Sequence, residues 1–289
     1  MLLAPLLAFA FTVSEPRIPA GGPGGNTHNS VIMIQGEPST TRLHVSLDAP
    51  QATPLLSTGF PYTEGTRLWD IEADAAQIEL HYLFPIRGTY TLNVDETHGN
   101  GMHSSFKKSI DVPEDPRTLC ALAAFIAALF GAGAIAGSLL VSGVALRTAT
   151  LLCVALLATS IPAYAFDAAT APGILWPVTA RITGGDPSVF VVEVANVEEN
   201  KQLFRATLPS RDGRLRLRFQ FYDGAPHVLA MLALRDRMLM QTWRKNIQVN
   251  ALEPPLGRRL WILFEMLSIF AAGYAAGAFA RYHKTLKGS

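Results

Sequence analysis

Charge and cysteine are both scarce in this chain. Charged side chains make up 16% of its 289 residues, whereas an ordinary soluble domain carries about 25%. The formal net charge is +1, so the chain lacks the basic surplus with which nucleic-acid-binding proteins meet phosphate. Its two cysteines exclude a disulfide-stapled scaffold, and its hydrophobic fraction of 49% excludes a disordered chain.

Catalytic motifs are absent as well. The sequence contains no HExxH, CxxC, GxSxG or Walker A pattern. Ser104 and Ser105 follow His103 directly, but neighbours in sequence do not have the geometry of a catalytic triad. The sequence therefore assigns no catalytic residue, and we expect a protein that is not an enzyme.

Long uncharged runs account for the missing charge. Residues 118–146 and 148–166 contain no charged side chain, and residues 260–280 contain only Glu265. A helix of about 20 apolar residues crosses the hydrocarbon core of a bilayer, and core helices of soluble proteins are usually shorter and amphipathic. Each run therefore predicts a transmembrane helix, with the lipid bilayer as a partner.

Residues 1–14 are apolar but too short to cross a bilayer. They contain the small-x-small pattern Ala8-Phe9-Ala10 before polar residues begin, which predicts a signal peptide. The basic start of such peptides is missing, so a short uncleaved anchor or a misplaced start site is the alternative.

A signal peptide and three spans together set an orientation. They place residues 15–117 and 167–259 outside the cytoplasm, and the basic tail 281–289 inside it. Arg147 in the short inner turn and Arg281 in the tail agree with the excess of basic residues on cytoplasmic sides. We therefore expect a protein of the inner (cytoplasmic) membrane.

The strongest pattern is an internal repeat at an offset of 137 residues. The alternating stretch IELHYLF at 78–84 recurs as LRLRFQF at 215–221, and FKKSIDV at 106–112 recurs as WRKNIQV at 243–249. Period-2 strands separated by turn residues, without helical periodicity, predict immunoglobulin-like sandwiches. We therefore expect a membrane-anchored all-β protein: two tandem immunoglobulin-like β-sandwich domains, one in each soluble segment, on three transmembrane helices.

The repeat extends into the first and third spans. Gly133 and Gly137 in the first correspond to Gly273 and Gly277 in the third. Small residues four apart let helix backbones approach closely, so we expect these two spans to pack together or against a shared partner.

Glu265 is an acid within the third span. Ionisable residues inside a membrane are costly and often functional. Glu265 lies near the outer end of its span, where Arg258 or Arg259 could offset its charge, so a structural role is favoured.

Histidine and methionine raise the question of a metal. Six of the seven histidines lie in the two soluble segments. The densest group is His98, Met102 and His103, and the second segment adds His227. Imidazole and thioether ligands together suit copper, but no fixed ligand spacing closes the set. We therefore expect no cofactor, with copper handling as the alternative function.

The two predicted domains carry opposite charge, −6 over residues 15–117 and +4 over residues 167–259. Period 2 places three arginines of the second domain on one face of the repeated strand: Arg214, Arg216 and Arg218. We expect this row to dock on an acidic surface, either a partner protein or the first domain, because complementary patches orient association; a solvated face is the alternative. The acidic candidates in the first domain are Glu72, Asp74 and Glu79.

The stretch FPIRGTYTLNV at Phe84–Val94 resembles small membrane-anchored β-domains of the FixH and YtkA-like type. That resemblance implies an association with copper oxidase assembly and carries no functional residue across. The sequence as a whole favours a membrane scaffold, accessory or assembly subunit that presents its β-domains to membrane or extracytoplasmic proteins.

Overall fold

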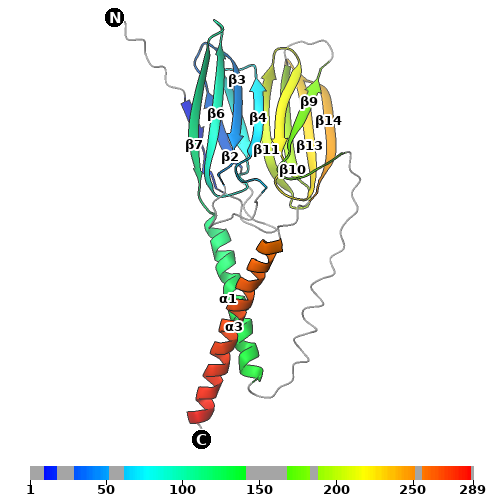
Figure 1. Cartoon of the computed structure of the whole chain (residues 1–289). Coiled ribbons are helices and arrows are strands. Elements are labelled where there is room, and N and C mark those ends of the chain that lie inside the picture. Colours follow the sequence, from blue (N-terminus) through cyan, green and yellow to red (C-terminus); the bar gives the residue numbers. More distant parts are fainter. Residues whose placement is uncertain are drawn as a thin grey trace, which may run out of the picture. The chain divides into compact units, whose positions relative to one another are not determined.

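The structure, a computed structural model, describes residues 10–17, 29–51, 62–140, 168–182, 188–250 and 256–287. The chain divides into two compact units. The β unit contains all the described strands, and the helix unit contains the two described helices (Figure 1).

The β unit consists of two halves that repeat the same series of strands. The first half contains β1 (Ala10–Val13), β2 (Ser30–Gln35), β3 (Thr40–Asp48), β4 (Arg67–Ala73), β5 (Gln77–Tyr82), β6 (Gly88–His98) and β7 (His103–Val112). The second half contains β8 (Ala168–Thr170), β9 (Leu175–Arg181), β10 (Ser188–Asn196), β11 (Lys201–Ser210), β12 (Arg214–Gln220), β13 (Pro226–Arg235) and β14 (Met238–Val249).

Two sheets run through both halves, as Figure 1 shows. Sheet A has the strand order β1-β2-β5-β11-β10-β13-β14-β8, and sheet B has the order β7-β6-β3-β4-β12-β9. In the first half β3 lies between β4 and β6 while β5 belongs to the other sheet, and in the second half β10 lies between β11 and β13 while β12 belongs to the other sheet. This is a Greek-key connection of the kind found in immunoglobulin-like sandwiches.

A buried tyrosine supports the same fold. The Tyr90 hydroxyl donates to the Ile86 carbonyl at 2.5 Å and accepts from the Ile86 amide at 3.0 Å. A tyrosine near the start of this strand that bonds to the backbone a few residues upstream is the tyrosine corner of immunoglobulin-like domains. The predicted immunoglobulin-like β-fold is therefore confirmed.

The two predicted tandem sandwiches are joined edge to edge in the structure. β4 of the first half pairs with β12 of the second in sheet B, and β5 of the first half pairs with β11 of the second in sheet A. We call these the β4–β12 joint and the β5–β11 joint. A sandwich standing alone would expose the N–H and C=O groups of its edge strands. The pairing across the joints gives some of these groups hydrogen-bonding partners.

The two joints are equivalent under the internal repeat. β5 matches β12, and β4 matches β11, so each joint pairs the same two strand types with the halves exchanged. The contact is therefore isologous, like the interface of a twofold-symmetric dimer. Four residue pairs form the β4–β12 joint and three form the β5–β11 joint.

The hydrophobic core is continuous across the joints. Four fully buried rings meet there, two from each half: Trp69, Tyr82, Phe204 and Phe219. Their centroids are 6.2 Å apart for Trp69–Tyr82, 6.4 Å for Tyr82–Phe204 and 5.3 Å for Phe204–Phe219. Aromatic side chains bury large areas in tilted and edge-to-face pairs such as these, so the joints share one apolar interior.

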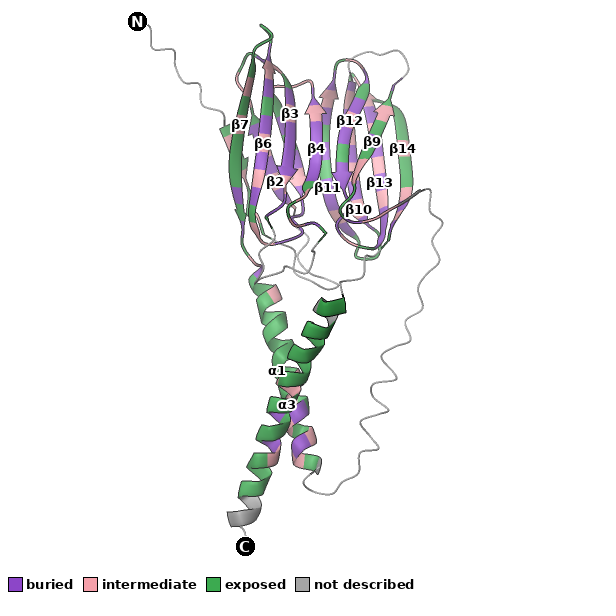
Figure 2. Cartoon of the chain, viewed as in Figure 1, coloured by how far each residue is buried: buried purple, intermediate pink, exposed green. Residues whose placement is uncertain are grey.

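The helix unit contains α1 (Pro116–Leu140) and α3 (Leu256–Lys287). Both helices contain stretches long and apolar enough to cross a membrane, Pro116–Leu139 and Leu260–His283. Most of their residues are exposed, and the buried ones gather where the two helices cross (Figure 2). Such exposure of large apolar side chains suits lipid rather than water.

Of the three expected spans, the described residues contain two, and the span 148–166 lies outside them. The tail expected from residue 281 continues α3 to Lys287. The segment 1–14 was expected to be a leader, but Ala10–Val13 forms β1, which pairs with β2, and Phe11 and Val13 pack against the core. Its first nine residues lie outside the described part of the chain.

Candidate functional site

The β4–β12 joint contains two arginines of the predicted basic row, Arg216 and Arg218. Strand β12 alternates as expected, with Leu215, Leu217 and Phe219 buried and the arginines on the outer face. Arg216 lies opposite Glu72 and Arg218 lies opposite Asp70 in the strand register. Two of the three arginines therefore face acidic residues of the first half, while Arg214 lies opposite Arg181 on the other side of β12.

The structure places the three predicted acids differently. Arg216 Nε lies 3.8 Å from Glu72 Oε2, and a second ion pair joins Arg216 to Asp212. Asp74 accepts from Arg42 Nε at 2.9 Å and from the Arg211 amide at 2.8 Å, so it ties the β4–β5 turn to the second half. Glu79 lies on β5, one residue beyond the paired stretch of the β5–β11 joint.

Asp70 is the acid that the sequence reasoning missed. Its side chain is only 5% exposed and forms an ion pair with Arg218. His44 Nε2 lies 2.6 Å from Asp70 Oδ1, and Arg67 Nη1 lies 3.8 Å from Asp70 Oδ2. Asp95 Oδ2 lies 3.4 Å from the other ring nitrogen of His44. One carboxylate thus joins cationic side chains of both halves.

Hydrogen bonding perturbs the charged groups beside this joint. Burial would raise the pKa of Asp212, but bonds from Ser210, Arg216 and the Arg214 amide lower it below its ordinary value. The hydrogen bond to Asp74 raises the pKa of Arg42 against the opposing effect of burial. These directions favour the ionised forms and so maintain the charge pairing at the joint.

The β5–β11 joint has a different outer face. Its paired residues are Phe204–Ala206 with Tyr82–Leu80, and Arg205 lies opposite His81. His81 Nε2 lies 3.0 Å from Glu79 Oε1. No ion pair or hydrogen bond of the Arg205 guanidinium is present in the part of the chain that the structure describes.

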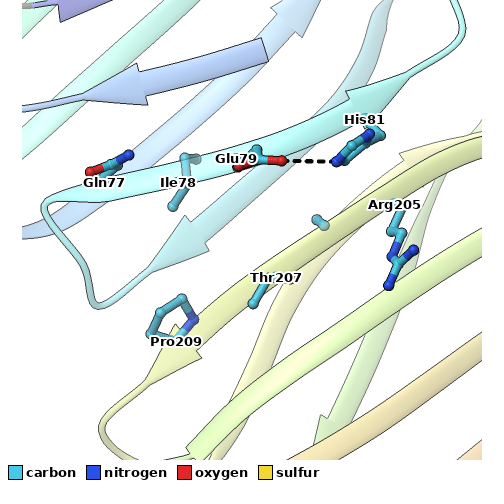
Figure 3. Close-up of a pocket in the computed structure, with 8 residues that line it drawn as sticks. Gln77, Ile78, Glu79, His81, Arg205, Thr207 and Pro209 are labelled. Atoms are coloured by element: carbon cyan, nitrogen blue, oxygen red, sulfur yellow. Dashed lines mark hydrogen bonds and ion pairs between the residues drawn. The ribbon is translucent and has the colours of Figure 1, made fainter. Parts of the chain in front are cut away.

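Beside these residues the two strands bound a groove of about 620 Å³, shown in Figure 3. Its β5 wall consists of Gln77, Ile78, Glu79 and His81, and its β11 wall consists of Arg205, Ala206, Thr207 and Pro209. Ile78 and Ala206 are buried core residues, so the groove has an apolar floor and polar walls. Its volume lies within the range of about 300–1,000 Å³ for small-ligand sites.

Three of the four predicted copper ligands lie on the β6–β7 hairpin, where the His98 amide donates to the Met102 carbonyl at 2.9 Å. His98 is nearly buried, with Nδ1 3.0 Å from Ser39 Oγ and Nε2 2.9 Å from Ser104 Oγ. Met102 and His103 are exposed on the β6–β7 hairpin. Among the described residues no group of three or more histidine, cysteine and acidic side chains is placed to hold a metal.

The buried position of His227 is explained by its contacts at the start of β13. The repeat aligns it with Tyr90, the residue of the tyrosine corner. Its Nδ1 lies 2.8 Å from the Ala225 carbonyl oxygen, and its Nε2 lies 2.8 Å from Asp223 Oδ1. The start of β13 and the tip of the β6–β7 hairpin lie at opposite ends of the strands, about 30 Å apart for strands of this length. The described residues therefore do not fit a copper site built from the predicted set.

In the helix unit, α1 and α3 contact each other at the four predicted glycines. A Cβ atom built on each glycine would lie about 2 Å from a carbonyl oxygen of the other helix: Gly133 2.2 Å from Phe270, Gly137 2.1 Å from Tyr274, Gly273 2.1 Å from Phe130 and Gly277 1.9 Å from Ala134. Only glycine allows so close an approach. Glu265 is exposed on α3, and the side chains of Arg258 and Arg259 lie outside the described set.

Comparison with known proteins finds matches among solved structures alone. No family model matches the chain, and no curated protein sequence matches it. Among solved structures it is similar to a two-domain fibronectin type III segment of chicken tenascin, with 8% identity and a TM-score of 0.20 over 83% of this chain and 98% of that one. It is also similar to fibronectin(III)-like modules of Clostridium thermocellum CbhA, with 9% identity and a TM-score of 0.21 over 83% and 94%. A third match is dimeric latent PorU from Porphyromonas gingivalis, with 9% identity and a TM-score of 0.23 over 85% of this chain and 20% of that one.

Proposed function

We propose that this chain is an integral membrane scaffold, accessory or assembly subunit that presents its β unit to protein partners outside the cytoplasm. The observation that carries the proposal is the fusion of the two halves into two continuous sheets. A pair of sandwiches joined by two ladders and one core offers a partner a single extended surface whose parts keep a fixed geometry. A fixed geometry lowers the ordering cost of binding.

The helix unit supports the membrane part of the proposal. The large side chains of α1 and α3 that are exposed include Leu122, Phe125, Leu263 and Phe264. Contiguous exposed apolar surface of this kind is unfavourable in water. In a bilayer the same side chains would contact lipid, while the glycine contact would hold the two helices together.

Affinity purification tests the partner. The full chain, tagged at its C-terminus, is solubilised in mild detergent and the co-purifying proteins are identified by mass spectrometry. We expect a defined set of membrane or extracytoplasmic proteins that is absent from a tagged helix pair lacking the β unit. Recovery of the same proteins with both baits, or of the chain alone, would contradict a scaffold role for the β unit.

Cysteine labelling tests the sidedness. Thr242 is exposed on β14, so a Thr242→Cys variant with Cys120→Ser and Cys153→Ser carries a single accessible thiol on the β unit. We expect a membrane-impermeant maleimide to label it in cells whose inner membrane is intact. Labelling only after the inner membrane is permeabilised would place the β unit in the cytoplasm.

A further inference from the structure

The internal repeat allows the two joints to be compared position by position. With strands aligned by their register, His81 takes the place of Arg218, and Arg205 takes the place of Asp70. One joint therefore pairs an arginine with a nearly buried carboxylate, Arg218 with Asp70. The other sets a histidine opposite an arginine and contains no carboxylate at the equivalent point.

Glu79 does not bridge His81 and Arg205. It lies 3.0 Å from His81 on the same strand, and Figure 3 shows the two side chains joined along β5 while Arg205 projects from β11. Glu193 of β10 lies opposite Arg205 in the strand register, but among the described residues no carboxylate lies within ion-pair distance of the Arg205 guanidinium. A guanidinium presents a planar fork of donors that matches a carboxylate, so an added carboxylate would restore the pairing of the other joint.

The ladder between the strands also stops early at this joint. The fourth pair of the β4–β12 joint is Arg216 with Glu72, and its equivalent, Glu79 with Thr207, is not formed. Further on, Pro209 has no N–H to donate, and the next backbone hydrogen bond to β11 comes from the β4–β5 turn, where the Asp74 amide donates to the Pro209 carbonyl at 2.9 Å. Between these points the facing edges of β5 and β11 have no ladder partner among the described pairings. Such edges are the surfaces on which extended peptides add.

We propose that the groove between β5 and β11 binds an extended peptide segment of a partner protein through an acidic side chain, whose carboxylate lies between Arg205 and His81. The polar walls at Gln77 and Thr207 provide hydrogen-bonding groups for the segment, and the buried floor at Ile78 and Ala206 accommodates a small apolar side chain. The inference rests on the proposed scaffold function, because it names the chemistry of the segment that the scaffold takes.

Peptide binding to the purified full chain in detergent tests the site. The probe is a synthetic Thr-Val-Asp-Val-Thr peptide with a capped C-terminus and a neutral fluorophore, because β-branched residues favour the extended form. Its fluorescence anisotropy is titrated at low salt, where charge pairing is least screened. The same peptide with Asn in place of Asp is the matched ligand control. Acetate added as a competitor distinguishes a free carboxylate from a peptide segment.

We expect the Asp peptide to bind at least about tenfold more tightly than the Asn peptide, because charge-assisted hydrogen bonds are the strong ones. Arg205→Gln should weaken binding of the Asp peptide by a similar factor. Arg244→Gln should leave it unchanged, because Arg244 is an exposed arginine on β14, away from the groove. Both substitutions are at exposed positions, and melting curves of the variants confirm that they fold.

Equal affinity for the two peptides, or equal loss in the Arg205 and Arg244 variants, would overturn the site. Displacement by acetate at the concentration of the peptide would overturn its assignment to a peptide segment. If Arg205→Gln abolishes peptide binding but the same proteins still co-purify, those proteins bind another surface. The assignment of the groove to them then fails, while the scaffold proposal stands. If peptide binding behaves as expected but no protein co-purifies, the scaffold proposal fails and the site stands.

Discussion

Replacement of Asp70 by asparagine tests the contact between the halves most sharply among single substitutions. Asparagine keeps the size of the side chain but removes its charge and turns an NH₂ group towards cationic partners. Asp70 is 5% exposed and bonds or pairs with His44, Arg218 and Arg67. The change therefore weakens contacts on both sides of the β4–β12 joint without creating a cavity.

The magnitude follows from burial. Loss of one partner from a fully buried ion pair costs about 3–5 kcal/mol, and a hydrogen bond to a charged group contributes about 1.5–3 kcal/mol. The side chains of Arg218 and His44 are 54% and 37% exposed, so water compensates part of the loss. We therefore expect Asp70→Asn to lower the free energy of unfolding by about 1.5–3 kcal/mol. For a unit of this size that corresponds to a fall in Tm of roughly 4–10 °C.

The assay is thermal unfolding of the full chain in detergent, followed by circular dichroism and by tryptophan fluorescence, which reports on the buried Trp69. Asp95→Asn is the matched control, because Asp95 also faces His44 but is 53% exposed; it should cost less than about 0.5 kcal/mol. Arg218→Gln alone and combined with Asp70→Asn completes a double-mutant cycle with a coupling of about 1 kcal/mol. Equal effects of the two asparagine variants, or no coupling, would refute the cross-joint role of Asp70.

Three further predictions follow from other parts of the molecule. Burial raises the pKa of Tyr82, Tyr90 and Tyr222 above the ordinary value of 10, so the folded chain keeps them neutral while the unfolded chain ionises them, and stability should fall as the pH rises above about 10. Phenolate absorbance should then show these tyrosines titrating together with the loss of circular dichroism, and full titration before unfolding would contradict the burial. Gly137→Leu should push α1 and α3 apart by more than about 1 Å and broaden the distance distribution between spin labels on the two helices; Gly131→Leu is the control, because a Cβ there meets nothing within 4 Å, and equal broadening would contradict the contact. Metal analysis of the purified chain should find no stoichiometric copper, since the ring nitrogens of His98 face serine hydroxyls; copper that is lost in Met102→Ala and His103→Ala would instead favour the copper alternative.

Local pattern predicted the elements that the repeat marks. The alternating residues of β5 and β12 showed both strands and which faces are buried, because a half-buried strand repeats with period 2. The outward arginines of β12 follow from the same rule. The equivalent glycines of α1 and α3 identified the face on which the helices meet, because close helix approach needs small residues.

The joints were not predictable in the same way. β4 and β11 have neighbours on both sides, and the outer face of β4 at Asp70 is covered by His44, Arg67 and Arg218, so Trp69, Asp70 and Ile71 are buried in succession. This hides the period-2 signal. The one clue was an acid within the apolar run LWDI. The pairing of Arg205 with His81 joins residues 124 positions apart, and nothing local to either residue specifies that neighbour.

The most direct test of the central claim, that the two halves form one β unit, is a disulfide across the β4–β12 joint. Opposite residues in antiparallel strands have Cα atoms about 4.5–5.5 Å apart, within the range for a disulfide. In full-length chain lacking Cys120 and Cys153, Glu72→Cys with Arg216→Cys should therefore crosslink on oxidation within one chain, as peptide mass spectrometry would detect. Glu79→Cys with Thr207→Cys, the equivalent positions beside the groove, should remain as thiols. Failure of the first pair to crosslink, or equal crosslinking of both pairs, would contradict the account.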